Sequence, residues 1–410
     1  MSLHLQWVGE DAYDRVALTR LRCYAPASGK HERFDQGVKL DGRQRPGDFL
    51  LATRDGVDVG TSTALSLKMW MRGARFDCQG VAYVGTIKTH RRGGSDGERG
   101  IASQLMDATI RKAREREEPI TALMPFRASF YEHFGYGNGE RRVEWTVPLA
   151  LMPRGEFAGY RFYEKRDDAA LLSLRAGEAS AGQCDVETDA AALANYQRTW
   201  PDGMTFVDDP AGDGKLEAYA HVLEERGAQT ATINIEDWGA TSPAALVRLL
   251  HMLGSLKDQY TFARLTLPGD LPLNRLLRET QVPHRQVDHP VAAARPYTRM
   301  QVRILDHRKV LEAMTLPAAT AGKLTIAIRE CEKEVTRLTL ELSGGRITAR
   351  PATGDADVMM TDVLWASILT GDLPATTARA LGLIECRSDA ALSLLSGFSA
   401  GPTPFCQEYF

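Results

Sequence analysis

One stretch of the 410-residue chain restricts the possible folds more than any other. Residues 81–117 have the pattern of an apolar strand, a loop rich in glycine and arginine, and an amphipathic helix. In the helical part, Ile101, Leu105 and Ala108 recur at the spacing of one helix face. Strands alternating with helices are typical of a layered α/β or α+β domain and disfavour an all-helical bundle.

The loop in this stretch, residues 91–100, has the composition of a phosphate-binding site. Glycines let backbone amides approach an anion closely, and the N-terminus of the following helix adds about half a positive charge. Arg91, Arg92 and Arg99 can pair with phosphate oxygens. A solvated surface loop would have the same composition, so the residues alone leave both interpretations open.

Two common nucleotide-binding motifs are absent from the loop. No Gly-Lys-Ser/Thr follows it, which excludes a Walker loop, and the Gly-x-Gly-x-x-Gly pattern of dinucleotide-binding folds is missing. The sequence therefore predicts a different phosphate-bearing cofactor.

The length of the chain favours two or three domains, because single cores seldom exceed about 250 residues. A strand and helix pattern recurs after the first third, with a helix that Ser242 caps and Pro243 begins, but without a Gly-rich loop. The Pro-, Ala- and Arg-rich segment 290–296 is a candidate linker. The predicted domains are residues 1–148, 149–296 and 297–410.

Composition narrows the class of partner. The formal net charge of −3 gives no reason to expect nucleic acid or an anionic membrane, and no segment is long enough to cross a bilayer. Six cysteines lie without a pair or a Cys/His group at metal-ligand spacing, so we expect reduced thiols and no metal. The N-terminus turns acidic at once and lacks the pattern of a signal peptide. A cytoplasmic location is predicted.

Two motifs together resemble a known family. Residues 81–93, VAYVGTIKTHRRG, resemble the acetyl-CoA motif of the GNAT N-acetyltransferase superfamily. Residues 130–137, FYEHFGYG, and the chain ending FCQEYF narrow the resemblance to the Eis (enhanced intracellular survival) family, over the whole chain.

This resemblance implies a fold and an activity. The implied α/β (α+β) architecture has two tandem GNAT-like domains, of which only the first carries the cofactor motif, and then a domain resembling sterol carrier proteins. The implied activity is acetyl-CoA-dependent N-acetyl transfer to a primary amine, such as an aminoglycoside-like compound, a polyamine or a lysine side chain. The family also implies a homo-oligomer, hexameric in its best-known members.

The resemblance assigns roles to individual residues. Val84, Thr86 and Ile87 would offer backbone groups to the pantetheine arm of acetyl-CoA, near the bulge where an oxyanion donor is expected. Tyr131 would protonate the departing CoA thiolate, and the C-terminal carboxylate of Phe410 would accept the proton of the amine. Because an α-carboxylate with a pKa of about 3.5 is a weak base, it would act through water or by polarising the ammonium group.

The loop departs from the common GNAT pattern through an insertion at residues 95–98, SDGE. One register of the motif would bring Asp96 close to the phosphates, which is electrostatically unfavourable. The preferred register instead puts Arg99 beside the phosphates and begins the helix at Gly100, Ile101 and Ala102.

Packing offers a competing interpretation of several of these residues. Tyr131 lies among other aromatic residues, which more often form a core than a catalytic site, and neither His90 nor His133 has an evident acidic partner. Cys406 has no visible histidine partner and is expected to be a packed thiol. The alternative function is a non-catalytic protein that binds acyl-CoA or a lipid, with the sterol-carrier-like domain holding the ligand.

Overall fold

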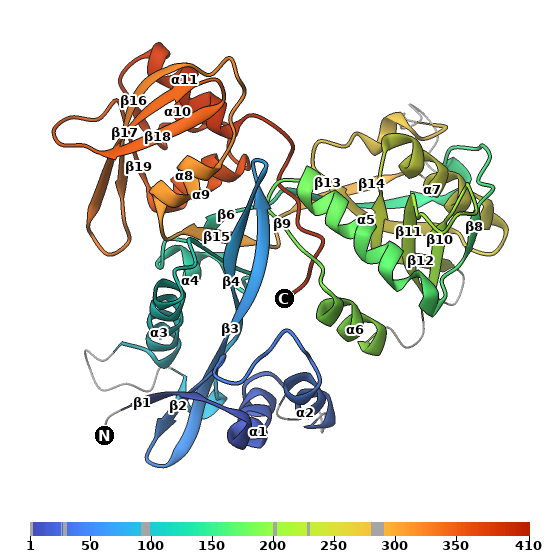
Figure 1. Ribbon diagram of the computed structural model, residues 1–410. Coiled ribbons are helices and arrows are strands. Elements are labelled where there is room, and N and C mark those ends of the chain that lie inside the picture. Colours follow the sequence, from blue (N-terminus) through green and yellow to red (C-terminus); the bar gives the residue numbers. More distant parts are fainter. Residues whose placement is uncertain are drawn as a thin grey trace. The chain divides into compact units, whose positions relative to one another are not determined.

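The structure is a computed structural model, shown in Figure 1. It describes residues 3–25, 27, 31–91, 99–199, 203–227, 230–279 and 291–410. Contacts within the chain divide it into two compact units. The first unit comprises residues 1–139, 300–401 and 408–410, and the second comprises residues 140–299 and 402–407.

The larger sheet of the first unit follows the strand order β1-β2-β3-β4-β5-β15-β6. Neighbouring strands run antiparallel except β4 and β5, which are parallel. The strands are β1 (His4–Val8), β2 (Phe49–Arg54), β3 (Val57–Met71), β4 (Ala74–Thr86), β5 (Ile120–Leu123), β6 (Gly137–Asn138) and β15 (Gln301–Ile304). Strand β15 therefore reaches this sheet from a distant part of the sequence and pairs with β5 and β6.

Helices cover both faces of this sheet, as the alternating side chains of β2 show. Leu50 and Ala52 pack with α3 (Ile101–Glu115), whereas Phe49 and Leu51 pack with α1 (Tyr13–Tyr24) and α2 (His31–Lys39). The helix predicted from residue 101 is confirmed and ends near residue 115. The short helix α4 (Ala128–Glu132) follows β5.

The turn between β2 and β3 is the two-residue Asp-Gly turn that the sequence indicates. Asp55 and Gly56 both have positive φ, at 52° and 76°, as the two-residue turn of a twisted hairpin requires.

The sheet of the second unit follows the order β14-β7-β13-β12-β11-β10-β8. Only β12 and β13 are parallel, and α7 connects them. The strands of the sheet are β7 (Arg142–Pro148), β8 (Tyr160–Phe162), β10 (Met204–Asp208), β11 (Ala218–Arg226), β12 (Ala231–Ala240), β13 (Phe262–Pro268) and β14 (Ala293–Tyr297). The unit also contains the short strand β9 (Asp185–Val186) and the helices α5 (Asp168–Ala181), α6 (Ala190–Thr199) and α7 (Pro243–Ser255).

The linker expected at residues 290–296 is wrong for its last residues, which belong to β14 and pair with β7. Pro296 is compatible with a strand here, because β14 is at the edge of the sheet, where an amide donor on the open side is not needed. Pro290 lies outside the described residues.

A smaller sheet in the first unit has the order β18-β17-β16-β19-β20. Its strands are β16 (Gly322–Arg329), β17 (Val335–Ser343), β18 (Arg346–Pro351), β19 (Val358–Thr361) and β20 (Glu385–Cys386). The associated helices are α8 (His307–Ala313), α9 (Asp362–Thr370), α10 (Ala375–Ala380) and α11 (Asp389–Ser399). Trp365 and Phe398 are fully buried and pack α9 against α11, with ring centroids 5.8 Å apart. Among the helices in the described part of the chain, none has the length and apolar character that a membrane span needs.

Candidate active site

Strand β4 carries a β-bulge near its end. Thr61 of β3 pairs with Gly85 and Thr63 pairs with Ala82, so Tyr83 and Val84 together face a single residue of β3. Tyr83 has a φ of 53°, which is uncommon for an aromatic residue and marks the point at which the strand bends.

The two parallel strands separate at the bulge. Pairing of β4 with β5 ends at Val81 and Leu123, whereas pairing of β4 with β3 continues to Thr86. Backbone groups of β4 beyond Val81 therefore lack a partner strand on the β5 side and can hydrogen-bond to an extended ligand. The hydroxyl of Thr86 is buried without a hydrogen-bond partner in the described part of the protein.

The structure distinguishes the three residues whose backbone groups are predicted to contact the cofactor. Val84 and Thr86 lie on the separated part of β4. Ile87 has both backbone groups engaged within the protein: its amide donates to the carbonyl of Val59 at 2.9 Å, and its carbonyl accepts from the amide of His90 at 3.0 Å. Val84 and Thr86 are thus the better placed of the three.

Helix α3 presents an open N-terminus beside the separated strands. Gly100 precedes the first turn, and no side chain in the described part of the chain caps it. The first turn, which includes Ile101 and Ala102, has no acidic residue. The first amides of the helix can therefore bind an anion, and the helix dipole favours one.

The N-terminus of α7, the corresponding helix of the second unit, is capped. Ser242 accepts a hydrogen bond from the amide of Ala245 at 3.1 Å, and Pro243 removes another donor. Among the described residues, a side chain caps the N-terminus of α7 and none caps that of α3.

The arginines of the loop differ in their surroundings. Arg99 forms an ion pair with Asp107 of α3, and its guanidinium lies 5.9 Å from the ring centroid of Phe134. Its side chain is 61% exposed, so it can turn toward a phosphate group. Arg91 is exposed. Arg92 and the insertion at 95–98 lie outside the described residues.

Tyr131 lies on α4 inside an aromatic cluster. Its ring meets that of Phe130 edge to face at 5.0 Å, and only 4% of the residue is exposed. Burial raises the pKa of Tyr131 to about 12, so the phenol keeps its proton at neutral pH. The neighbouring Tyr136 bonds Thr121 at 3.0 Å, whereas the hydroxyl of Tyr131 has no partner within the described residues. Tyr131 therefore has a proton that it can donate to a ligand.

The ring of Phe410 lies against β4 at Gly80, where an added Cβ atom would be 3.0 Å from Cδ2 of the phenylalanine. The next residue, Val81, packs with Tyr131 on the opposite face of the strand. Phe410 and Tyr131 thus approach β4 from opposite faces, close to the place where β4 and β5 separate.

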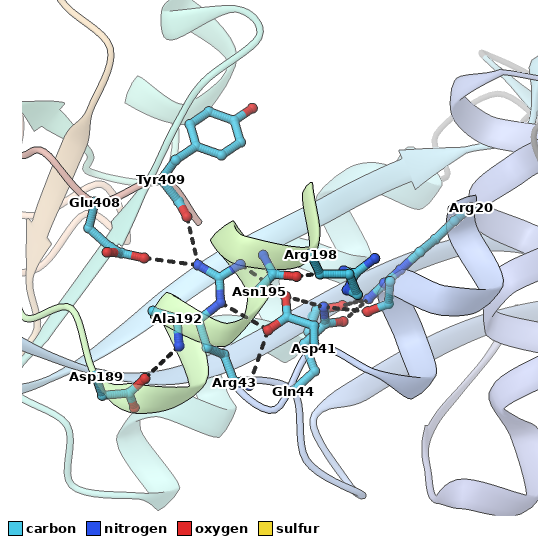
Figure 2. A network of polar contacts seen from close by, with 12 residues as sticks. Arg20, Asp41, Arg43, Gln44, Asp189, Ala192, Asn195, Arg198, Glu408 and Tyr409 are labelled. Atoms are coloured by element: carbon cyan, nitrogen blue, oxygen red, sulfur yellow. Dashed lines mark hydrogen bonds and ion pairs between the residues drawn. The ribbon is translucent and has the colours of Figure 1, made fainter. Parts of the chain in front are cut away.

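The last residues of the chain are held by Arg43 (Figure 2). Its Nη1 donates to Oε1 of Glu408 at 3.0 Å and to the carbonyl of Tyr409 at 2.7 Å. Its Nε and Nη2 donate to the two carboxylate oxygens of Asp41 at 3.0 Å and 2.9 Å.

The same polar network continues into the sheet. Gln44 donates to Asp41 at 3.0 Å and accepts from Arg20 of α1 at 2.7 Å. Arg20 is fully buried and its guanidinium lies 3.7 Å from the ring centroid of Tyr83 in the bulge. The sequence did not indicate a role for Arg20, Asp41, Arg43 or Gln44, because residues 41–44 have the composition of an ordinary polar turn and the contacts with Glu408 and Arg20 join distant positions.

A protein-family comparison assigns a class to the first sheet. The family model described as an acetyltransferase (GNAT) domain matches residues 9–139. The chain therefore carries a GNAT acetyltransferase domain, and the enzyme class expected from the sequence is confirmed.

Relatives from two Streptomyces species support the same enzyme class. An uncharacterized N-acetyltransferase of Streptomyces griseus is 26% identical over 367 residues, which cover 82% of this chain and 83% of the relative. An uncharacterized N-acetyltransferase of Streptomyces avermitilis is 25% identical over 370 residues, with 82% of each chain covered.

Solved structures establish the fold over the full chain. A GCN5-related N-acetyltransferase from Anabaena variabilis superposes with a TM-score of 0.84 at 18% identity, and both chains are covered completely. Eis1 from Mycobacterium abscessus gives a TM-score of 0.81 at 17% identity, again with complete coverage of both chains.

Proposed function

We propose that this protein is an N-acetyltransferase of the Eis type, which transfers the acetyl group of acetyl-CoA to a primary amine. The observation that carries the proposal is the separation of β4 from β5 beside the uncapped N-terminus of α3. An extended thioester with an anionic group at one end matches this arrangement of free backbone groups and helix amides.

The chemistry of the opening fits acetyl-CoA. Val84 and Thr86 would hydrogen-bond the pantetheine arm along the free edge of β4, where the unpartnered hydroxyl of Thr86 supplies a further polar group. The diphosphate would lie at the amides that follow Gly100. Arg91, Arg92 and Arg99 would supply positive charge around it.

The proposed reaction requires one proton to be removed and another to be supplied. The nitrogen lone pair of the neutral amine attacks the thioester carbonyl, so that a C–N bond forms and the C–S bond breaks. Tyr131 gives its phenolic proton to the departing thiolate. The proton that the nitrogen loses after the attack passes to the carboxylate of Phe410, directly or through water. The carboxyl group then gives this proton to solvent, and Tyr131 recovers its own proton from solvent.

The positions of the two groups support this division of labour. Tyr131 and the ring of Phe410 approach β4 from opposite faces beside the opening, so the proposed acid and the residue that bears the proposed base come from different sides of the strand. The raised pKa of Tyr131 keeps the phenol protonated at neutral pH, so the proton is present when the thiolate leaves.

The strand pattern supports a tandem pair of GNAT-like domains. In the larger sheet of the first unit and in the sheet of the second unit, an antiparallel series leads to one parallel pair joined by a helix, β4 with β5 and β12 with β13. The smaller sheet is the part that we assign to a sterol-carrier-like domain. The three domain boundaries, a homo-oligomeric assembly, an Eis-type hexamer and a cytoplasmic location stay predictions from the sequence.

The proposal is tested by measuring free-thiol release from acetyl-CoA with aminoglycosides, polyamines and lysine peptides, each with and without the acceptor. Thiol release that depends on an acceptor is the expected result, and the active acceptor identifies the substrate class. Calorimetric titration with acetyl-CoA should show binding in the absence of any acceptor. A protein that neither binds acetyl-CoA nor releases thiol, and that carries a lipid in native mass spectrometry, would instead be the non-catalytic carrier.

A further inference from the structure

The side chain of Arg43 holds the chain one residue before its terminus, at the carbonyl of Tyr409. We propose that Arg43 is a positioning residue for the C-terminal carboxylate of Phe410. This inference rests on the proposed function, in which that carboxylate accepts the proton of the amine. Arg43 would act through the backbone of the tail and not on the substrate.

The donors of Arg43 are divided between two tasks. Nε and Nη2 form a two-point contact with Asp41, which fixes the plane and the direction of the guanidinium. Nη1 is then directed at the tail, where it donates to both Glu408 and the carbonyl of Tyr409. Lysine could not reproduce this, because a single ammonium group cannot hold two planar acceptors in a fixed relative orientation.

The charged side chains that form this anchor are almost completely buried. The side chains of Arg43 and Asp41 are 9% and 7% exposed, and that of Glu408 is 1% exposed. Removal of Arg43 from the docked tail would leave the carboxylates of Asp41 and Glu408 at this depth without their cation, which is strongly unfavourable. Burial of Asp41 tends to raise its pKa, but hydrogen bonds from Arg43 lower the pKa below its usual value and keep the carboxyl group ionised.

The anchor acts over a very short distance. The carbonyl of Tyr409 belongs to the same planar peptide group as the amide nitrogen of Phe410. Fixing that carbonyl therefore leaves only the rotations within Phe410 to place the terminal carboxylate. The ring of Phe410 in turn lies against Gly80, so Arg43 and β4 restrict Phe410 through its preceding peptide group and through its ring.

The anchor is also connected to the cofactor strand. Asp41 accepts a hydrogen bond from Gln44, which accepts one from Arg20. Arg20 bonds Thr63 of β3 at 2.7 Å and stacks on Tyr83 in the bulge. One buried network thus holds the tail that carries the carboxylate and the bulge that opens the cofactor strand.

The test compares Arg43→Gln with Arg43→Lys in the full-length protein. We expect Arg43→Gln to lower kcat about 30-fold, because misplacing a reacting group by about 1 Å can cost about a hundredfold in rate. The dissociation constant of acetyl-CoA should change by no more than about twofold. The kcat of Arg43→Lys should lie between that of the parent protein and that of Arg43→Gln.

Arg116→Gln is the matched control. The guanidinium of Arg116 lies in the same unit, pairs with the buried carboxylate of Asp48 at 2.6 Å and bonds the carbonyl of Ala64 at 3.1 Å. It lacks any described contact with the tail, so its loss should reduce the melting temperature without lowering kcat. An equal loss of kcat in Arg116→Gln and Arg43→Gln would show a general structural effect and overturn the proposal.

A double-mutant cycle combines Arg43→Gln with a one-residue glycine extension at the C-terminus. It distinguishes a failure of this inference from a failure of the proposed function. The extension moves the carboxylate away from Phe410, so adding Arg43→Gln to it should cause little further loss of kcat. Additive losses of kcat from the two changes would overturn the role of Arg43 but not that of the carboxylate. The same conclusion would follow if the extended protein lost activity while Arg43→Gln kept its full kcat. An extended protein with full kcat would remove the role of the carboxylate itself. If Arg43→Gln does not fold, Arg43→Lys completes the same cycle.

Discussion

The guanidinium of Arg20 stacks on the ring of Tyr83, with Cζ 3.7 Å from the ring centroid, directly at the bulge of β4. Burial lowers the pKa of Arg20 to about 10, so the side chain still carries its charge at neutral pH. The positive φ of Tyr83 is therefore supported by a cation–π contact with the buried Arg20 and by the hydrogen bonds that orient Arg20.

Replacing Arg20 by Met should loosen the bulge. The substitution keeps the apolar stem but leaves Gln44 and Thr63 without their donor, at about 1 to 3 kcal/mol for each unsatisfied group. We expect the free energy of unfolding to fall by about 3 kcal/mol and the dissociation constant of acetyl-CoA to rise about tenfold. Urea unfolding and calorimetry measure the two effects.

Arg15→Met on the same helix is the control for Arg20→Met. Arg15 forms an exposed ion pair with Asp58, so its loss should change the stability by no more than about 1 kcal/mol. A variant at Arg20 that binds acetyl-CoA with unchanged affinity would show that the stack supports the fold without shaping the cofactor strand.

Tyr131→Phe tests the proposed general acid. Removing only the hydroxyl should lower kcat about a hundredfold or more, because general acid catalysis contributes about 10² to 10⁴ in rate. The affinity for acetyl-CoA should change little, since the ring and its packing remain. Steady-state kinetics with calorimetry measure both quantities.

Tyr136→Phe provides the comparison within the same cluster. Its hydroxyl bonds Thr121 in the core, so its removal should cost about 1 kcal/mol of stability and leave kcat nearly unchanged. Equal losses of kcat in the two variants would assign Tyr131 to packing.

The pH dependence of the rate should reflect the raised pKa of Tyr131. Because the pKa is about 12, the phenol remains protonated well above neutral pH, so the acid does not become inactive as the pH rises. We expect the rate to increase from about pH 7 to about pH 10 as the acceptor amine loses its proton, with no falling limb. A falling limb near pH 9 that disappears in Tyr131→Phe would contradict the raised pKa.

Local sequence patterns were sufficient to predict the elements around the site. Asp55 and Gly56 indicate the hairpin turn, and the apolar spacing from Ile101 indicates α3, because both signals depend only on neighbouring residues. The lack of a Gly-rich loop before Ser242 likewise pointed to a second unit without an open helix N-terminus.

Contacts between distant residues could not be predicted in this way. Arg43 and Glu408 are separated by 365 positions, and no local pattern relates them. The bulge depends on Tyr83 in a conformation that sequence propensity disfavours and that Arg20 supports through tertiary packing. Strand β15 joins the first sheet, although residues 140–299 of the second unit precede it in the sequence.

Glu118 should make the stability of the first unit depend on pH. The residue is 6% exposed, Oε2 has no hydrogen-bond partner among the described residues, and burial raises its pKa from 4.5 to about 7. The folded protein therefore binds more protons than the unfolded chain between these two values, so this contribution to stability decreases as the pH rises through that window.

Glu118→Gln removes this titration. Near pH 4.5 the variant and the parent protein should have similar stability, whereas at pH 8 the variant should be more stable by about 1 kcal/mol, after allowance for partial solvent screening. Urea unfolding at the two pH values measures the difference. A variant that is destabilised equally at both values would show that Glu118 is ionised and paired in the folded protein.

Gly80→Ala should disturb the chain terminus from the side of β4. The added Cβ would lie 2.5 Å from Cδ1 of Leu67 and 3.0 Å from Cδ2 of Phe410, so both side chains must move. We expect a loss of about 1 to 2 kcal/mol in stability, as for other overpacked sites, and a fall in kcat of about tenfold. Gly37→Ala on α2 is a suitable control, because its added Cβ meets no atom within 4 Å and alanine favours a helix. Since acetyl-CoA would lie beyond Val81, its affinity should be unchanged in Gly80→Ala, and a loss of affinity without a loss of kcat would place Phe410 outside the reacting centre.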